Sequence, residues 1–392
     1  MDTSPPDPRA VQRMVAVFGL GGFAGALAGR ALDPLMGELA TDFATPHEQV
    51  ALLASAFTLP YALIQPILGP MGDSFGKRRI IGLCLGLLAL MLAACALAPS
   101  LDSLFAARIA AGLAAGGIFP LTLALFGDRV PMAQRQVAIS RFLACAILGQ
   151  LAGGAVSGLA APFIGWRGIM AVCALAAAAS TLVVWLDSRR TSAPALPSRR
   201  PTLPEVLRRY ADILRNRAAQ PLFIGVALEG ACVFGPFPYF AVLLGADGHG
   251  TLRAGIAVAC FGVGGFAYTM LAPFLLRRIG QARMMRLAGA AVLAGMLCLA
   301  TGMPDVGIGG ALLIGLGFFM LHNSIQTRVT EVAPGARGSA VALHAFCYFL
   351  GQAVGPAVFG LLMVAAGAGP SLALSGAGVL VISLWLSRLR AG

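Results

Sequence analysis

A polar, basic and glycine-rich stretch between two long apolar runs constrains this chain more than any other feature. It reads Gly69-Pro-Met-Gly-Asp-Ser-Phe-Gly-Lys-Arg-Arg79, and apolar runs at 50–70 and 80–99 flank it. Each run has close to the ~20 residues with which a helix crosses the hydrocarbon core of a bilayer. We therefore expect two spanning helices joined by a tight turn that faces water on the cytoplasmic side of a membrane.

The whole chain repeats this pattern, so we expect an all-α membrane protein. Its residues are 58% hydrophobic and 11% charged, and the mean hydropathy is +0.84. Soluble domains are roughly half apolar and about a quarter charged, so this balance disfavours a soluble fold. A hydropathy window of about 19 residues predicts twelve spans. They lie at 14–38, 50–70, 80–99, 103–126, 137–161, 168–186, 221–244, 253–276, 284–302, 306–326, 338–366 and 371–388.

Basic residues are unevenly divided between the loops on the two sides of such a bundle. Lys and Arg near short loops resist translocation, so the side that is richer in them faces the cytoplasm. The poor side holds only Arg167 and Arg253. The rich side holds Arg9, Arg13, Lys77 to Arg79, Arg129, Arg135, Arg189 to Arg217, Arg277 to Arg286, Arg328, Arg337, Arg388 and Arg390. We expect both termini in the cytoplasm and the protein in the inner (plasma) membrane.

The middle of the chain separates two predicted six-helix halves. Residues 187–220 contain four prolines and then a charged stretch from Glu205 to Arg217. This composition favours a cytoplasmic linker that ends in an amphipathic surface helix. The N-terminal bundle is then 1–186 and the C-terminal bundle 221–392.

The two halves also share sequence. Gly149-Gln-Leu-Ala-Gly-Gly-Ala-Val-Ser-Gly158 matches Gly351-Gln-Ala-Val-Gly-Pro-Ala-Val-Phe-Gly360 at an offset of 202. Parallel repeats of this kind build transporters whose substrate site lies between the halves. Glycines at i and i+4 let helices approach closely and rock, which makes Gly149, Gly153, Gly351 and Gly355 candidate gating residues.

These features resemble the major facilitator superfamily over essentially the whole chain. The loop 69–79 is similar to its pattern G-x-L-A-D-R-x-G-R-R, and Arg108-x-x-x-Gly112-x-x-x-Gly116 is similar to its arginine motif. The decapeptide 149–158 is similar to the G-x-x-x-G-P-x-x-G-G of proton-driven exporters, with Gly154 in place of Pro and Ser157 in place of Gly. The resemblance implies two pseudo-symmetric six-helix bundles, alternating access and a complete pathway within one monomer.

The loop 69–79 supplies the remaining gating candidates, which are Asp73, Gly76, Arg78 and Arg79. The Asp73 carboxylate can hold a cytoplasmic gate shut by pairing with nearby arginines and with the positive end of the helix that begins near Gly338. The alternative is that Asp73 and its neighbours only fix a tight turn and the topology.

Charged residues within the predicted spans are functional candidates, since each costs about 2.5–3.5 kcal/mol at mid-bilayer. Arg30 and Asp33 lie three residues apart, so they form either a local ion pair or a substrate-binding pair. Glu229 has no opposite charge within one turn, which suits a carboxylate that takes up and releases a proton. We expect proton coupling at Glu229, with Asp33 as second choice. Arg108 resembles the arginine near the family's proton site, although it could instead anchor the outer interface.

Uncharged polar side chains complete the candidate substrate cavity. These are Tyr61, Gln65, Gln150, Tyr239 and Gln352, which could equally bond or pack between helices. His322 and His344 are expected to be packing residues.

Other classes of protein are disfavoured. The net charge of +12 is scattered in short clusters rather than gathered on one face, so nucleic acid is not an expected partner. The few His, Asp and Glu residues lack metal spacing, Lys77 is followed by Arg78 rather than by the Ser or Thr of a nucleotide-binding loop, and no nucleophile motif occurs. We therefore expect no enzyme activity and no cofactor. The favoured function is proton-coupled export of small organic or drug-like compounds, and the alternative is proton symport or facilitated uptake of an organic acid, sugar or similar metabolite.

Overall fold

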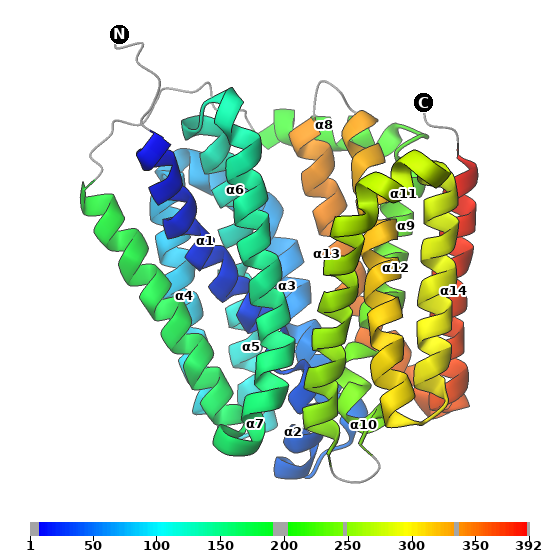
Figure 1. Ribbon diagram of the computed structural model, residues 1–392. Helices are drawn as coiled ribbons and strands as arrows, with labels where there is room; N and C mark the ends of the chain where they lie inside the picture. The colour runs from blue at the N-terminus through cyan, green and yellow to red at the C-terminus, as the bar shows by residue number, and fades with distance from the viewer. Residues whose placement is uncertain (1–7, 191–202, 246–248, 333–336, 390–392) are drawn as a thin grey trace. The chain divides into compact units, whose positions relative to one another are not determined.

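The computed structural model describes residues 8–190, 203–245, 249–332 and 337–389, and every regular element in these ranges is a helix (Figure 1). The all-α membrane fold predicted from the sequence is confirmed. The elements are α1 (Pro8–Arg30), η1 (Asp33–Leu35), α2 (Met36–Asp42), α3 (His47–Phe75), α4 (Lys77–Ala96), α5 (Leu101–Ala115), α6 (Ile118–Arg129), α7 (Met132–Arg190), α8 (Leu203–Arg215), α9 (Gln220–Phe234), η2 (Phe237–Tyr239), α10 (Phe240–Leu243), α11 (Gly250–Ala300), α12 (Pro304–Glu331), α13 (Arg337–Ala366) and α14 (Ala368–Arg388).

Two of these helices, α7 and α11, are each a pair of spans joined at one glycine. Gly165 has φ 66° and ψ 170°, and Gly280 has φ 71° and ψ 163°. Glycine adopts positive φ without the steric cost that a Cβ imposes, so the chain can reverse at a single residue. Both turns fall in the gaps predicted between spans, at 161–168 and 276–284.

The number of spans agrees with the sequence. The described residues contain ten stretches that are long and apolar enough to cross a membrane. One of them, Arg141–Arg189, has 49 residues and includes the turn at Gly165, so it supplies two spans. With α3, which has 29 residues, the described part of the chain accounts for twelve.

The first span is interrupted where the sequence predicted one helix over 14–38. The α-helix ends at Arg30, and the 3-10 helix η1 begins at Asp33 after two turn residues. Pro34 explains the break, since it has no N–H to donate and disfavours helical backbone at the residue before it. Arg30 therefore ends the α-helix and Asp33 begins η1, and the predicted pairing of their side chains stays a prediction.

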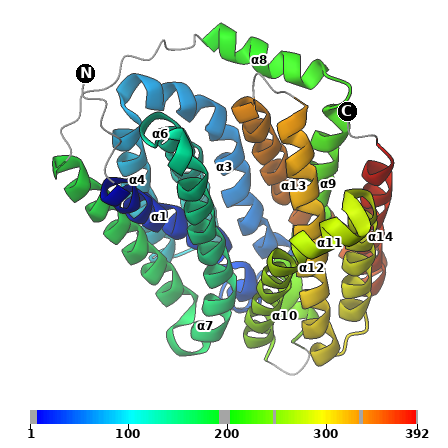
Figure 2. The same cartoon turned by 45° about the horizontal axis from the view of Figure 1, so that its top comes forward.

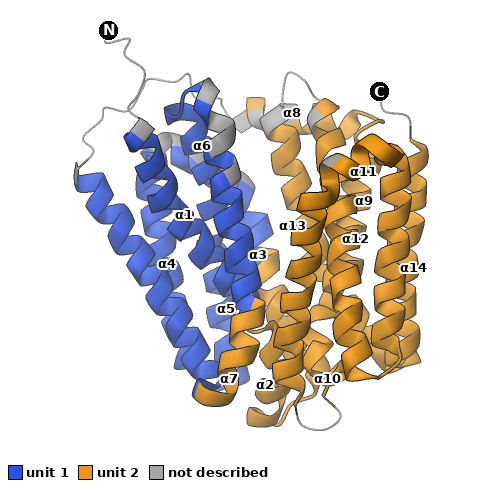
Figure 3. Cartoon of the chain, in the orientation of Figure 1, with its two compact units in different colours: residues 1–31, 60–153, 164–201 blue, residues 32–59, 154–163, 202–392 orange. Residues whose placement is uncertain are grey.

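Contacts between Cα atoms divide the chain into two compact units (Figure 3). Unit 1 comprises 1–31, 60–153 and 164–201, and unit 2 comprises 32–59, 154–163 and 202–392. The bundle boundaries predicted at 186 and 220 stay a prediction. Within the predicted linker, the expected amphipathic helix is present as α8, which contacts α13 and lies across the ends of α9 and α13 (Figure 2).

Each unit has its own buried core. In unit 1, α4 packs against α5 and α6, and α1 contacts α4 and α6. In unit 2, α9 packs against α12, α13 and α14, while α11 packs against α12 and α14. The centre of unit 2 is aromatic: the ring centroids of Phe234 and Phe318 are 5.1 Å apart, and those of Phe237 and Phe261 are also 5.1 Å apart. This aromatic centre includes Phe234, which lies on the same helix as Glu229.

Candidate functional site

The centre of unit 2 contains a carboxylate–imidazole pair. Nδ1 of His322, on α12, lies 2.8 Å from Oε2 of Glu229, on α9. The Glu229 side chain is fully buried, whereas 15% of the His322 side chain is exposed. A hydrogen bond of this length between a carboxyl group and an imidazole lets the two groups share or exchange a proton.

Aromatic rings enclose the pair. The His322 ring centroid lies 4.7 Å from that of Tyr348, 5.0 Å from that of His344 and 5.1 Å from that of Phe318. Two buried polar atoms of this cluster, Oε1 of Glu229 and Nε2 of His344, have no hydrogen-bond partner among the described residues. A charge in such apolar surroundings is costly, so the protonation state of the pair governs its energy.

A glycine beside the carboxylate brings the surrounding helices close. A Cβ at Gly230 would lie 2.6 Å from the carbonyl oxygen of Tyr348, so any side chain there would push α13 away from α9. Glu229 itself follows the apolar run at 221–228 and precedes another apolar stretch. Close packing on all sides explains why this carboxylate has no exposed surface.

Unit 1 holds its own buried charge, at Arg108 on α5. Nη1 of Arg108 donates a hydrogen bond of 2.9 Å to the carbonyl oxygen of Ala28 on α1. The side chain is completely buried. Arg108 thus ties α5 to α1 instead of reaching out to an interface at the membrane surface.

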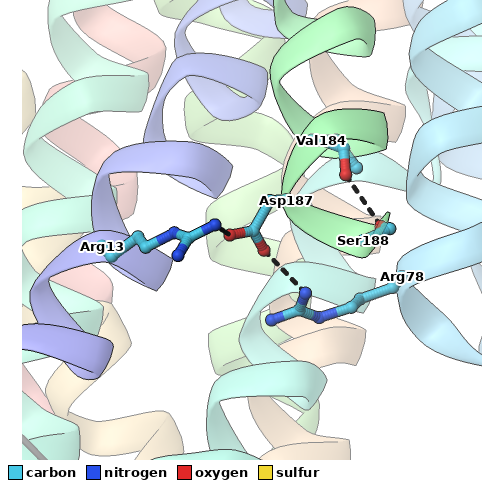
Figure 4. Close-up of polar contacts among 5 residues, drawn as sticks. All are labelled: Arg13, Arg78, Val184, Asp187 and Ser188. Atoms are coloured by element: carbon cyan, nitrogen blue, oxygen red, sulfur yellow. Dashed lines mark hydrogen bonds and ion pairs between the residues drawn. The ribbon is translucent and has the colours of Figure 1, made fainter. Parts of the chain in front are cut away.

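A second charged cluster lies near the turn between α3 and α4, where Gly76 has φ 92°. Asp187, on α7, lies between Arg13 and Arg78 (Figure 4). Its Oδ1 is 2.7 Å from Nη2 of Arg13, and its Oδ2 is 2.6 Å from Nη1 of Arg78. Nearby, Nζ of Lys77 lies 2.7 Å from Oδ2 of Asp128. These two ion-pair groups join the ends of α1, α4, α6 and α7.

The repeated glycines pack closely inside each unit, as their spacing predicted. A Cβ at Gly149 or Gly153 would overlap the carbonyl oxygens of Phe23 and Leu27 on α1. A Cβ at Gly351 or Gly355 would overlap those of Ala227 and Ala231 on α9. Gly149 and Gly153 therefore place α7 against α1, and Gly351 and Gly355 place α13 against α9. That these contacts permit rocking stays a prediction.

Comparison with known proteins decides the family. A family model described as Major Facilitator Superfamily matches residues 18–356. The chain belongs to this superfamily. It is therefore a multi-pass membrane transporter, and the resemblance drawn from its motifs is confirmed.

Relatives of this major facilitator transporter cover most of its length. It is 24% identical over 340 residues to the uncharacterized MFS-type transporter YybF of Bacillus subtilis (strain 168), covering 84% of this chain and 81% of that one. The crystal structure of the nucleoside transporter NupG matches with a TM-score of 0.76 at 14% identity, covering 96% of this chain and all of the other (100%). The D-xylose-proton symporter matches with a TM-score of 0.74 at 20% identity, covering 96% and 97%. At these identities the two structures show the fold alone.

The predicted substrate-binding residues of this transporter are divided between the two units. In unit 1, Arg30 is half-buried at the end of α1, and Tyr61, Gln65 and Gln150 are half-buried on α3 and α7. In unit 2, Asp33 and Gln352 are buried. The hydroxyl group of Tyr239 donates a hydrogen bond of 3.0 Å to the carbonyl oxygen of Pro356, so it serves helix packing. Their role in substrate binding stays a prediction.

The structure describes the predicted latch between Asp73 and the helix start near Gly338 only in part. Asp73 belongs to α3 and Gly338 to α13, but the side chain of Asp73 and the surroundings of Gly338 lie outside the described residues. Arg79 is exposed, and Arg78 pairs with Asp187. Asp187 was not among the sequence-predicted site residues.

The sequence interpretation of the histidines of this major facilitator transporter was incomplete. His322 and His344 were expected to pack, yet His322 bonds the carboxylate that we expected to carry the proton. The predicted spans 221–244 and 306–326 did not show the match, because they place Glu229 eight positions after a start and His322 four positions before an end. In the structure Glu229 lies nine positions after the start of α9, and His322 lies nine positions before the end of α12. Two antiparallel spans then place both residues at the same depth.

Proposed function

We propose that this chain is a proton-coupled exporter of small organic or drug-like compounds, with Glu229 as the group that holds the transported proton. The observation that carries the proposal is the buried Glu229–His322 contact of 2.8 Å at the centre of unit 2. A fully buried carboxylate with a titratable partner is arranged to bind and release protons rather than to stabilise the fold.

The chemistry of coupling follows from the cost of the buried charge. With one proton between them, Glu229 and His322 are neutral overall, either as acid and imidazole or as an ion pair. Loss of that proton leaves an uncompensated negative charge among aromatic side chains, which is unfavourable in apolar surroundings. When Glu229 and His322 have lost that proton, conformations that admit water or a substrate to the site are favoured, because polar contacts stabilise the negative charge. A proton gradient thus biases alternating access between the two sides.

The exporter direction has support from the sequence. The decapeptide 149–158 resembles the glycine pattern of proton-driven exporters, and its Gly149 and Gly153 lie against α1. The transporter would work as a monomer in the inner (plasma) membrane with both termini in the cytoplasm, since basic residues gather on that side of the predicted topology. Protons, a small-molecule substrate and the lipid bilayer are its partners, and no cofactor is required.

The alternative is uptake of a metabolite by proton symport or facilitated diffusion. One solved protein of the same fold is a D-xylose-proton symporter, which gives a precedent for symport within this architecture. Arg30 would then hold an anionic group of an organic acid. The direction in which substrate accumulates separates the two functions.

A growth screen followed by a vesicle assay tests the proposal. Cells that lack their main exporters are grown with toxic organic cations, neutral drugs and weak organic acids, with and without this chain. Compounds to which the chain confers resistance are then added to energised everted vesicles together with a pH-sensitive dye. We expect accumulation inside the vesicles and proton movement out of them. Substrate movement without proton movement would refute the coupling, and enhanced sensitivity together with inward accumulation in cells would favour uptake.

A further inference from the structure

Glu229 and His322 differ in how much of each side chain is exposed, although they bond each other. None of the Glu229 side chain is exposed, but 15% of the His322 side chain is. We propose that His322 transfers protons to and from Glu229, so that the buried carboxyl group exchanges protons with water only through the imidazole ring. This inference rests on the proposed role of Glu229 as the proton-holding group.

The contact has the geometry that such a transfer needs. Nδ1 of His322 faces Oε2 of Glu229 at 2.8 Å, within the range for direct proton transfer. A proton arriving at Nε2 makes the ring an imidazolium. The Nδ1–H proton then passes to Oε2, which leaves a neutral acid and a neutral imidazole protonated at Nε2. Release is the reverse: Oε2 returns its proton to Nδ1, and Nε2 gives one up.

Other routes to the carboxyl group are less suitable. Oε1 of Glu229 is buried and has no hydrogen-bond partner among the described residues, so His322 is the partner through which a proton can enter. The other titratable groups near the pair are Cys232, one turn along α9, and His344 and Tyr348 on α13. Thiol and phenol groups lose protons only well above neutral pH, whereas imidazole does so near it.

His344 provides a matched control because it is a second buried imidazole in the same cluster. Its ring centroid lies 5.0 Å from that of His322, yet among the described residues it makes no hydrogen bond to the Glu229 carboxyl group. Replacing either histidine by asparagine removes a ring of the same size from the same surroundings. Only the loss of His322 removes the bond to Glu229.

The probe is the proton itself, so the test does not depend on knowing the substrate. The purified full-length protein in detergent receives a rapid drop in pH, and time-resolved infrared spectroscopy follows the carboxyl C=O band. E229Q identifies the part of that band that belongs to Glu229. We expect H322N to slow the protonation of Glu229 by about a hundredfold with its final amplitude retained, while H344N stays within about twofold of the wild type.

Three results would overturn the proposal. They are protonation of H322N at the wild-type rate, equal slowing in H344N, and loss of the band amplitude in H322N, which would mean that His322 sets the equilibrium rather than the route. H322Q is measured in place of H322N if the asparagine variant does not yield folded protein. Failure of the proposed function can be told apart from failure of this inference. It would appear as unaltered proton-coupled transport by E229Q, and the infrared kinetics of the histidine variants do not bear on it.

Discussion

The Arg78 guanidinium group lies 2.6 Å from the buried Asp187 carboxylate, which joins the start of α4 to the end of α7 within unit 1. Arg13 on α1 binds the other oxygen of the same carboxylate at 2.7 Å. One acidic side chain thus fixes three helices. The residue that the offset of 202 places opposite Asp187 in unit 2 is Leu389, which has no charge.

At the end of α14, where Leu389 stands in place of an acidic residue, unit 2 uses an arginine and backbone carbonyl groups. Arg328 on α12 donates through Nη1 to the carbonyl oxygens of Leu386 and Leu389, at 2.7 and 3.4 Å, and through Nε to Gln281 at 3.2 Å. Carbonyl groups in the last turn of a helix are commonly satisfied by a basic side chain, and here the carbonyl oxygen of Leu386 also accepts a hydrogen bond of 3.2 Å from the backbone N–H of Leu389. The two halves therefore fasten equivalent helix ends by different chemistry.

Asp187→Asn is expected to destabilise unit 1. The substitution removes the charge that two guanidinium groups share and should cost about 2 kcal/mol, since charged hydrogen bonds at a buried carboxylate are lost. The measurement is the thermal midpoint of the purified protein in detergent. Asp128→Asn is the matched control, because Asp128 is 48% exposed and its pair with Lys77 should contribute less than about 1 kcal/mol. Equal thermal midpoints for the two variants would contradict the claim that the Asp187 carboxylate stabilises unit 1 more than the Asp128 carboxylate does.

Arg328→Ala should loosen the end of α14. The change removes three hydrogen bonds, two of them to the last carbonyl groups of α14, at a cost of about 2–3 kcal/mol. Hydrogen–deuterium exchange of the last turn of α14 checks this, and we expect faster exchange there than in the wild type. Arg283→Ala, at an exposed arginine on α11, serves as control. Unchanged exchange in the Arg328 variant would show that the helix end does not depend on this side chain.

Gly351→Ala should disturb the packing of α13 on α9. The added Cβ would overlap the carbonyl oxygen of Ala227, so the helices must separate, at a cost of about 1–3 kcal/mol. Gly309→Ala on α12 is the control, since a Cβ there has nothing within 4 Å. We expect a lower thermal midpoint and slower transport for the first variant only. A normal midpoint in Gly351→Ala would mean that the close approach is dispensable.

The fold was predictable because each spanning helix must satisfy its own backbone in lipid and therefore appears as an apolar run. The turns at Gly165 and Gly280 fell in predicted gaps for that reason. The break after Arg30 was missed although Pro34 was a visible signal, since hydropathy continues through it. Apolar length thus locates a span but does not show whether the helix is continuous within it.

The candidate site was predictable in part. Glu229 was identified because a lone carboxylate in an apolar span is costly, but its partner is 93 residues away in the sequence. Which helices meet, and how each is rotated about its axis, depends on packing between surfaces that are apolar on every side. For the same reason the pair between Arg78 and Asp187 was not predicted. A latch that joins Arg78 to Asp73 stays a prediction.

The most direct test of the central claim compares substrate and proton movement in the same proteoliposomes. Wild-type protein and Glu229→Gln are reconstituted with a compound to which the chain confers resistance, and both fluxes are recorded under an imposed pH gradient. Glu331→Gln, at an exposed carboxylate on α12, is the control. We predict that Glu229→Gln still exchanges the compound across the membrane but neither accumulates it nor moves protons with it, while Glu331→Gln behaves as wild type. Gradient-driven accumulation with unaltered proton flux in Glu229→Gln would contradict the account.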